Sequence, residues 1–249
     1  MNRDTVIAVL VALKREIGPF LGLMDKVTRK RHSGCSIWEG LFSGVKVRVI
    51  TTGMATEPPI DLLRGCSLLL STGFCGASRG TIHTGDLVVS SSVAFSDGDL
   101  ITRILNPHSS TGSFEGSGVF DIEVGNELLS VIREKLSLNG QVVHVGRTVT
   151  CARVINKREE KSILGNYFDA LAVDMEDYRR LRIARQLGTK MYCVRAVLDD
   201  SEDTIPGPWS GIGPGKLSAL LRKITPAQQS IGRMLTAFVP AALIKMEIE

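Results

Sequence analysis

The stretch from residue 170 to 203 constrains the fold more than any other part of the chain. A short apolar run ends at the acidic sequence Asp174-Met175-Glu176-Asp177. An amphipathic helical pattern follows and stops at Gly188. A second apolar run, Met191 to Leu198, again ends in acid, at Asp199-Asp200. This order predicts two parallel strands joined by a helical crossover, with both acidic clusters beyond the carboxyl ends of strands, where α/β folds bind ligands.

The composition fits one α/β domain that spans residues 1–249. Hydrophobic residues make up 43% of the chain, enough for a full core. The 30 basic and 26 acidic residues give a net charge of only +4, and 5% of residues are aromatic, so we expect no nucleic-acid partner. Five cysteines without a Cys-x-x-Cys spacing and four dispersed histidines predict neither a disulfide framework nor a metal site. They fit a reducing cytoplasm.

The pattern along the chain predicts a mixed, twisted central sheet flanked by helices. Apolar or alternating runs indicate strands at residues 6–13, 36–42, 45–50, 66–70, 87–95 and 142–149. Ser43-Gly44 lies between two of these runs and predicts a hairpin turn. Helical patterns cover residues 125–138 and 156–167, and two helical segments are expected at the end of the chain. Residues 96–120 are mostly polar without periodicity, which predicts a long loop.

Four polar clusters follow apolar runs in this pattern. They are Glu16, the glycine-rich sequence Gly73-Phe74-Cys75-Gly76, the segment Asp174–Glu176 and the pair Asp199-Asp200. In a parallel α/β chain such clusters line the same edge of the sheet, and convergence of this kind is what a site requires. We expect the glycine-rich sequence to form a loop in which backbone N–H groups closely approach a ligand.

Ordered motifs over residues 6 to about 205 give the chain a family resemblance. They are Ala12-Leu13-Lys14-Arg15-Glu16, the sequence 72–77 ahead of Thr84-Gly85-Asp86, Val173-Asp174-Met175-Glu176 and Arg195-Ala196-Val197-Leu198-Asp199. The set resembles the purine nucleoside phosphorylase / methylthioadenosine–adenosylhomocysteine nucleosidase superfamily. The Asp-Met-Glu form is similar to the hopanoid-associated nucleosidase-like branch. The resemblance implies a phosphorylase/hydrolase-like fold and hydrolysis of the N-glycosidic bond of a small-molecule purine nucleoside, for which we expect a 5′-substituted adenosine. It implies no cofactor, and we expect a homo-oligomer. Phosphate-dependent cleavage is the alternative reaction.

The resemblance also implies a role for each matching residue. Asp199 corresponds to the acid that protonates the leaving base, and a carboxyl group kept neutral by burial can do this. Glu176 corresponds to the residue that binds the ribose hydroxyls, with Met175 packing on the sugar. Glu16 corresponds to the glutamate that activates water in the hydrolytic members. Further binding residues are expected at Gly73, Phe74, Cys75, Gly76, Val154, Ile155 and, holding a neighbouring carboxylate, Arg195.

Alternative interpretations of these residues stay open at this point. Asp199 could cap a helix, Asp174–Asp177 could be an acidic first helical turn, and Glu16 could be a solvated helix start. Phosphorolytic members gather arginines around phosphate, and one of their positions is Ser71 here, which argues for hydrolysis. Lys14 or Arg15 could still contribute to phosphate binding. A catalytically silent nucleoside-binding or storage protein is an alternative of another class.

The apolar run Met234–Ile244 near the end of the chain has two interpretations. It is apolar on more sides than a surface helix, so a buried terminal helix or a subunit interface explains it. It could instead line the path of an apolar 5′ substituent or make a weak contact with a membrane surface.

Overall fold

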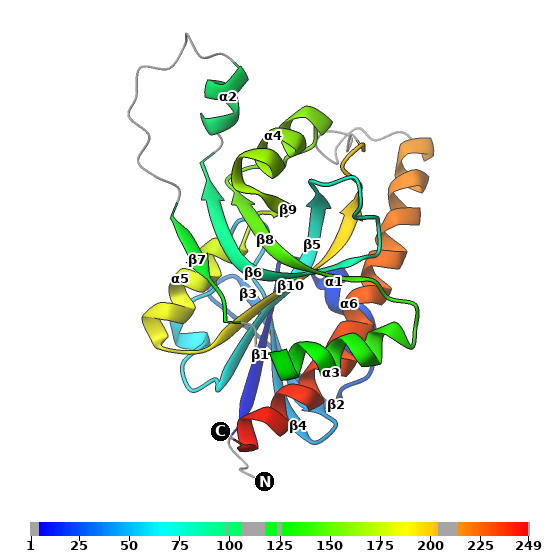
Figure 1. Ribbon diagram of the computed structural model, residues 1–249. Helices are drawn as coiled ribbons and strands as arrows, with labels where there is room; N and C mark the ends of the chain where they lie inside the picture. Colours follow the sequence, from blue (N-terminus) through cyan, green and yellow to red (C-terminus); the bar gives the residue numbers. More distant parts are fainter. Residues whose placement is uncertain (1–4, 98, 106–117, 124–125, 204–213, 249) are drawn as a thin grey trace.

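The protein is a mixed α/β structure whose strands form one sheet with helices on both faces (Figure 1). The computed structural model describes residues 5–97, 99–105, 118–123, 126–203 and 214–248. Its strands are β1 (Val6–Val11), β2 (Asp25–His32), β3 (Cys35–Phe42), β4 (Val45–Thr51), β5 (Leu68–Ala77), β6 (Leu87–Ser96), β7 (Val119–Asp121), β8 (Val143–Cys151), β9 (Ala170–Asp174) and β10 (Met191–Asp199).

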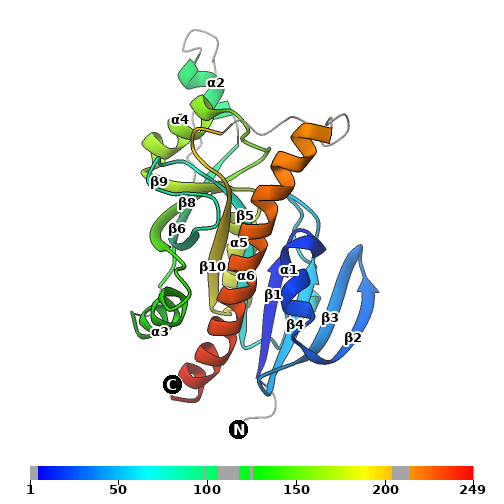
Figure 2. The same cartoon turned by 90° about the vertical axis from the view of Figure 1, so that its right-hand side faces the viewer.

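Helices cover the sheet from both sides. They are α1 (Lys14–Leu21), the 3₁₀ helix Ile60–Leu62, α2 (Asp99–Leu105), α3 (Asn126–Ser137), α4 (Arg158–Phe168), α5 (Asp177–Leu187) and α6 (Pro214–Ile248). Helix α6 packs against α1, α3 and β10 on one face, and Figure 2 shows α1 and α6 side by side there. Helix α5 lies on the other side of β5 and β10.

Five strands close into a ring, and the other four strands of the main sheet extend from it. Strand β5 pairs with β10, β10 with β6, β6 with β8, β8 with β9, and β9 returns to β5. The extension continues from β5 through β1, β4 and β3 to β2, while the short β7 pairs with β6. Strand β5 therefore has three neighbours and is the central strand of the sheet.

Strand β1 is apolar along its whole length because both of its faces are covered. Ile7, Val9 and Val11 belong to the core under α1 and α6, whereas Ala8 and Leu10 belong to the core under α5. A run without polar alternation is typical of such strands. The expected sheet with flanking helices is thus confirmed.

The parallel crossover predicted for residues 170–203 is wrong. Strand β5 separates β9 from β10, and it is antiparallel to β9 but parallel to β10. The two acidic ends still meet, because Gly76 of β5 faces Val173 on one side and Asp199 on the other. The closed ring brings them together, not a shared parallel edge.

Two predicted loops also contain regular structure. Strand β5 continues through the glycine-rich sequence to Ala77, so Gly73 to Gly76 form the end of a strand and not a loop. The expected loop at 96–120 contains α2 and β7, and residues 106–117 of it lie outside the described residues. The three residues of β7 pair with three residues of β6, and this pairing forms a strand in a stretch whose sequence has no strand pattern.

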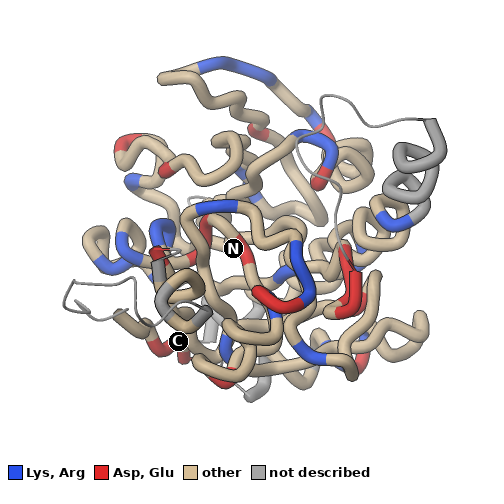
Figure 3. Tube along the Cα trace, turned by 90° about the horizontal axis from the view of Figure 1, so that it is seen from above, with Lys and Arg blue, Asp and Glu red and all other residues tan. Residues whose placement is uncertain are grey.

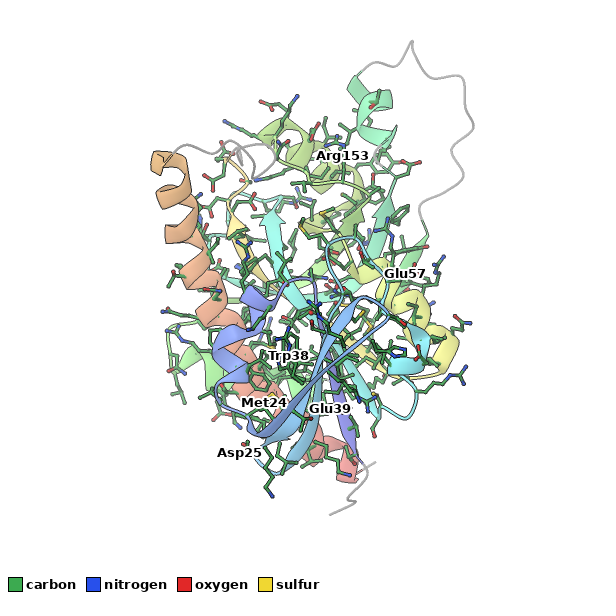
Figure 4. All side chains as sticks on the ribbon, turned by 180° about the vertical axis from the view of Figure 1, so that it is seen from behind. Met24, Asp25, Trp38, Glu39, Glu57 and Arg153 are labelled. Atoms are coloured by element: carbon green, nitrogen blue, oxygen red, sulfur yellow. The ribbon has the colours of Figure 1, made fainter. Side chains whose placement is uncertain are left out.

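The sequence pattern did not predict strand β2, because this strand carries mostly charged residues and no alternation of apolar and polar residues. It lies at the edge of the sheet and is exposed along its length, and charged side chains there oppose pairing with other chains. Ser33-Gly34 joins it to β3 with positive φ at both residues, as Ser43-Gly44 does between β3 and β4. Figure 4 shows Asp25 and Glu39 in this hairpin, at the opposite end of the molecule from Arg153.

The apolar C-terminal run lies in α6, and most of its described apolar side chains are buried within the chain. Met234, Leu235, Phe238 and Val239 are at most 1% exposed and belong to the core beneath α1 and β10. This is the buried terminal helix that the pattern allowed. Among the described residues, no helix is long and apolar enough to cross a membrane. Figure 3 shows Lys and Arg dispersed over the trace among Asp and Glu.

Candidate active site

Strand β5 forms the floor of the candidate site because two of its residues have no side chain. A Cβ atom on Gly73 would lie 2.9 Å from both Arg195 Nη1 and Glu16 Oε1. A Cβ atom on Gly76 would lie 3.0 Å from Asp199 Oδ2. Gly73 also has a φ of +145°, which side-chain-bearing residues rarely adopt. The glycines thus allow three charged side chains to pack directly on the strand.

Glu16 is buried at the start of α1, where it faces β5. Its Oε2 accepts a hydrogen bond from the Leu13 N–H at 2.7 Å, and its Oε1 accepts one from the Phe74 N–H at 3.2 Å. Burial raises the pKa of Glu16, while the Leu13 N–H and the charge of Arg195 oppose the shift. Glu16 is therefore not a solvated helix start. Lys14 and Arg15 are exposed.

Glu176 and Arg195 form a buried ion pair beside Glu16. Glu176 Oε2 lies 3.1 Å from Arg195 Nη1, and Oε1 accepts a hydrogen bond from the Ala55 N–H at 3.1 Å. Burial disfavours the charged form of Arg195, but the carboxylates of Asp177, Asp174 and Glu176 outweigh it and hold its pKa well above the usual value. The expectation that Arg195 holds a neighbouring carboxylate is consistent with this geometry.

Asp174 accounts for the acidic helix start. Its Oδ1 accepts hydrogen bonds from the N–H groups of Glu176 and Asp177, at 2.7 and 2.8 Å. Burial raises its pKa to about 7, with the Asp177 charge adding to the shift and Arg195 opposing it. Asp174 thus satisfies the first turn of α5 and leaves the Glu176 side chain to face Arg195.

Asp177, Arg180 and Ser71 complete a buried network that sequence reasoning missed. Ser71 Oγ donates to Asp177 Oδ1 at 2.5 Å and accepts from Arg180 Nη1 at 2.8 Å. Arg180 also donates to the Leu10 carbonyl at 3.1 Å and to Thr52 Oγ1 at 3.2 Å. One sequence signal could have revealed them. Asp177 and Arg180 are spaced so that they share one face of α5 with the apolar residues Leu181 and Ala184, and a charged residue on an apolar face indicates a buried partner.

Asp199 ends β10 and is 4% exposed. It contacts the ammonium group of the buried Lys161, which comes from α4. Burial raises the pKa of Asp199 to about 6, and Lys161 opposes the shift. Residues 200–203 form a turn, and no helix begins within them, so the helix-capping interpretation of Asp199 does not hold in the described part of the chain.

The remaining predicted residues lie at different depths. Met175 and Phe74 are half-buried, and Cys75 is buried in a small apolar cluster beneath β10. Val154 is 47% exposed in the segment after β8. Ile155 is buried in the apolar core that also contains Leu100 and Ile101 of α2 and Leu164 and Phe168 of α4. The charged residues and glycines therefore come together around β5, whereas Ile155 belongs to a separate apolar core.

Metal ligands do not gather among the described side chains. No group of three or more His, Cys, Asp or Glu residues in that part of the chain is placed to hold a metal ion. The carboxylates of the site are instead occupied by arginine, lysine and backbone N–H donors. All five cysteines are buried and free.

The family follows from comparison with known proteins. The profile of the phosphorylase superfamily matches residues 6–238. The chain belongs to this superfamily, as the ordered motifs of its sequence predicted.

Its relatives include nucleosidases. The 5′-methylthioadenosine/S-adenosylhomocysteine nucleosidase of Bacillus velezensis is 24% identical over 203 residues, which cover 78% of this chain and 85% of that protein. The corresponding enzyme of Bacillus licheniformis is 22% identical over 202 residues, with the same coverage.

Solved structures share the fold. The nucleosidase of Neisseria meningitidis in complex with methylthio-immucillin-A has a TM-score of 0.74 at 19% identity, covering 94% of this chain and 98% of that one. Futalosine hydrolase of Helicobacter pylori has a TM-score of 0.74 at 17% identity, covering 96% and 99%.

Proposed function

We propose that this protein hydrolyses the N-glycosidic bond of a purine nucleoside, with a 5′-substituted adenosine as the substrate class. The observation that carries the proposal is the convergence of Glu16, Glu176 and Arg195 with Asp199 on a few residues of β5. The related nucleosidases of the two Bacillus species support the same reaction class.

Asp199 is assigned the role of general acid. Breaking the bond between ribose and purine leaves negative charge on the base, so a proton must reach a ring nitrogen as the bond breaks. The O–H bond of Asp199 breaks, an N–H bond forms on the base, and the electrons of the C–N bond leave with it. A carboxyl group with a pKa of about 6 holds a proton in mildly acidic solution and can release it.

Glu176 is assigned to the ribose. A carboxylate can accept hydrogen bonds from two neighbouring hydroxyl groups at once. Arg195 and the Ala55 N–H fix its two oxygens from behind, so its orientation is set before a ligand arrives. Half-buried Met175 precedes it and would pack on the sugar.

Glu16 is assigned to water. The sugar carbon becomes cationic as the base leaves, and the attacking water must lose a proton as its oxygen bonds to that carbon. Glu16 is buried, held by two backbone N–H groups and raised in pKa by burial, which suits a general base. Glu16 and Arg195 both lie against Gly73, which supports a position for Glu16 beside the pair assigned to the ribose.

The arginines of the site favour water over phosphate as the nucleophile. Phosphate needs cationic groups that are free to bind it. Arg195 is already paired with Asp177 and Glu176, and Arg180 donates to Ser71, Thr52 and a carbonyl oxygen. Lys14 and Arg15 are exposed, whereas Glu16 is buried.

The test is purine release from 5′-methylthioadenosine by enzyme dialysed free of phosphate, with and without added phosphate. We expect equal rates and a free ribose derivative as product. A strict phosphate requirement with a ribose 1-phosphate product would identify a phosphorylase. Ligand binding without purine release from any nucleoside of a panel would identify a nucleoside-binding protein.

Two variants connect this activity to the assigned residues. Asp199→Asn should lower turnover on the order of a hundredfold or more while binding persists. Glu16→Gln should abolish turnover. Glu202→Gln is the matched control, because Glu202 is exposed near Asp199 and pairs with Arg158 on the surface. Near wild-type turnover in Asp199→Asn would remove Asp199 from the mechanism.

We further propose a cytoplasmic location, which five buried, free cysteines support. A homo-oligomer stays a prediction, and light scattering on the purified protein would test it. Contact of the C-terminal run with a membrane or with a 5′ substituent finds no support in the described side chains of α6, because Met234, Leu235, Phe238 and Val239 are buried in the core.

A further inference from the structure

Lys161 is a fully buried lysine directly behind Asp199. It lies in the first turns of α4 on the same face as Leu164 and Phe168, where an apolar residue would be expected. A buried ammonium group is unfavourable unless its charge is balanced and its N–H groups have acceptors. The reason for a lysine at this position must therefore lie in what it contacts.

All three N–H groups of the ammonium have acceptors in the segment that ends β10. Lys161 Nζ contacts Asp199 Oδ2 and donates to the carbonyl oxygens of Asp200, at 2.9 Å, and Asp203, at 3.1 Å. The lysine thus ties α4 to the turn that carries the candidate acid. Its single charge partner among these contacts is the Asp199 carboxyl group.

The other side of the Asp199 carboxyl group is fixed by β5. The group lies over Gly76, where a Cβ atom would be 3.0 Å from Oδ2 and 3.2 Å from Oδ1. Lys161 holds Oδ2, and no hydrogen bond between described residues ends on Oδ1. One oxygen of the carboxyl group is therefore anchored by Lys161, which also fixes the orientation of the other.

The charged and titratable groups around Asp199 come from several elements. Lys161 faces it from α4, Cys75 from β5, and Asp203 from the turn that follows β10. Lys223 of α6 contacts the Asp203 carboxylate, which also accepts the Asp200 N–H at 2.8 Å. The Asp200 carboxylate faces away, toward Thr84 and His83. Lys161 is the one cation among the described residues in direct contact with Asp199.

We propose that Lys161 is a positioning residue that fixes the Asp199 carboxyl group with Oδ1 toward the leaving base and stabilises the carboxylate that forms when the proton is transferred. This inference rests on the proposed role of Asp199 as the general acid. As the proton moves from Asp199 to the base, negative charge appears on the carboxyl group. An ammonium group already in contact with it stabilises that charge without reorganisation.

The contact between Lys161 and Asp199 also affects how readily the buried acid releases its proton. Burial alone disfavours the carboxylate and makes the proton hard to release, whereas an adjacent cation favours the carboxylate. The structure contains both influences on Asp199, with burial the larger and Lys161 opposing it. Removal of the lysine charge should therefore make Asp199 a weaker acid.

The experiment compares Lys161→Gln and Lys161→Met with the wild type in the pH dependence of kcat/KM for 5′-methylthioadenosine. Because Asp199 acts when protonated, kcat/KM falls as the pH rises through its pKa. Without the lysine charge this fall should move to higher pH by about one unit or more, and kcat should drop about tenfold or more. Lys161→Arg keeps the charge and should recover part of kcat.

Arg79→Met is the matched control for a structural clamp on the same helix. Arg79 donates to the carbonyl oxygens of Gly165 and Ala170 and pairs with Asp169, so it holds the other end of α4 without contacting Asp199. It should lower the melting temperature and leave the pH profile in place. An unchanged pH profile in a folded Lys161→Gln protein would overturn the proposal. If both uncharged variants fail to fold, a Lys161→Arg protein with a wild-type pH profile and at least part of the wild-type kcat supports the charge requirement. A folded Lys161→Arg protein with a shifted pH profile or no activity overturns it.

Asp199→Asn separates this inference from the proposed function. If Asp199→Asn turns over normally, the acid assignment fails and the lysine inference fails with it. If Asp199→Asn is inactive but Lys161→Gln keeps the wild-type pH profile, only the inference about Lys161 fails.

Discussion

Replacing Gly73 with alanine would place a methyl group where Glu16 and Arg195 already lie. The new Cβ atom would be 2.9 Å from both Glu16 Oε1 and Arg195 Nη1, closer than real Cβ atoms approach other heavy atoms. The φ of +145° adds backbone strain. Strain of this kind costs about 1–3 kcal/mol, and forcing extra volume into a packed site costs about 1–3 kcal/mol.

The expected result for Gly73→Ala is a loss of both stability and activity. The free energy of unfolding should fall by roughly 2–6 kcal/mol, a large share of the 5–15 kcal/mol of a native protein. Turnover should fall at least tenfold, because misplacing a reacting group by about 1 Å can cost on the order of a hundredfold. Urea denaturation measures the first quantity, and purine release from 5′-methylthioadenosine measures the second.

Gly140→Ala provides the matched control. Gly140 has a φ of +67° but nothing within 4 Å of an added Cβ atom, and it lies between α3 and β8. Its substitution should cost about 1–2 kcal/mol of backbone strain and leave turnover unchanged. If Gly73→Ala loses no more stability than Gly140→Ala and keeps wild-type turnover, Glu16 and Arg195 are free to move and close packing over β5 is not what holds the site.

Three further predictions follow from the site. Glu176→Gln should weaken the binding of ribosides strongly and that of 2′,3′-dideoxy analogues hardly at all in titration calorimetry, and equal losses would assign Glu176 a structural role. The pH profile of kcat/KM should be bell-shaped. It falls as the pH rises through the Asp199 pKa of about 6, because the acid loses its proton, and it falls at low pH as Glu16, whose pKa is raised by burial, becomes protonated. A flat profile from pH 4 to 9 would contradict both assignments. Arg180→Met should lower the free energy of unfolding by about 3 kcal/mol, because it removes one charge from a buried network. Arg182→Met, on the exposed face of α5, should lower it by less than about 1 kcal/mol. Equal losses in urea denaturation would show that the network is not stabilising.

Local pattern was sufficient for most strands and helices. Apolar runs gave β1, β6 and β8, and the Ser43-Gly44 turn gave the β3–β4 hairpin, because these signals lie within a few residues of one another. The same turn signal at Ser33-Gly34 was present, but the charged β2 has no apolar alternation to accompany it. The edge strand β2 is formed by backbone pairing with β3, and the local sequence of β2 carries no signal of that pairing.

The sequence by itself determined which residues are chemically suited to the site. Glu16, Glu176 and Asp199 stand out because they are carboxylates just after apolar runs, and Arg195 because it interrupts such a run. The ordered motifs that contain them place the chain in the phosphorylase superfamily. Only the tertiary structure decided how they meet. The ring of five strands brings oppositely directed β9 and β10 to the same glycine of β5, and pairing between distant strands depends on the whole sheet. The partners Lys161, Asp177 and Arg180 also emerged only there, because a buried charge is recognised by what surrounds it, and those neighbours lie up to 170 residues away along the chain.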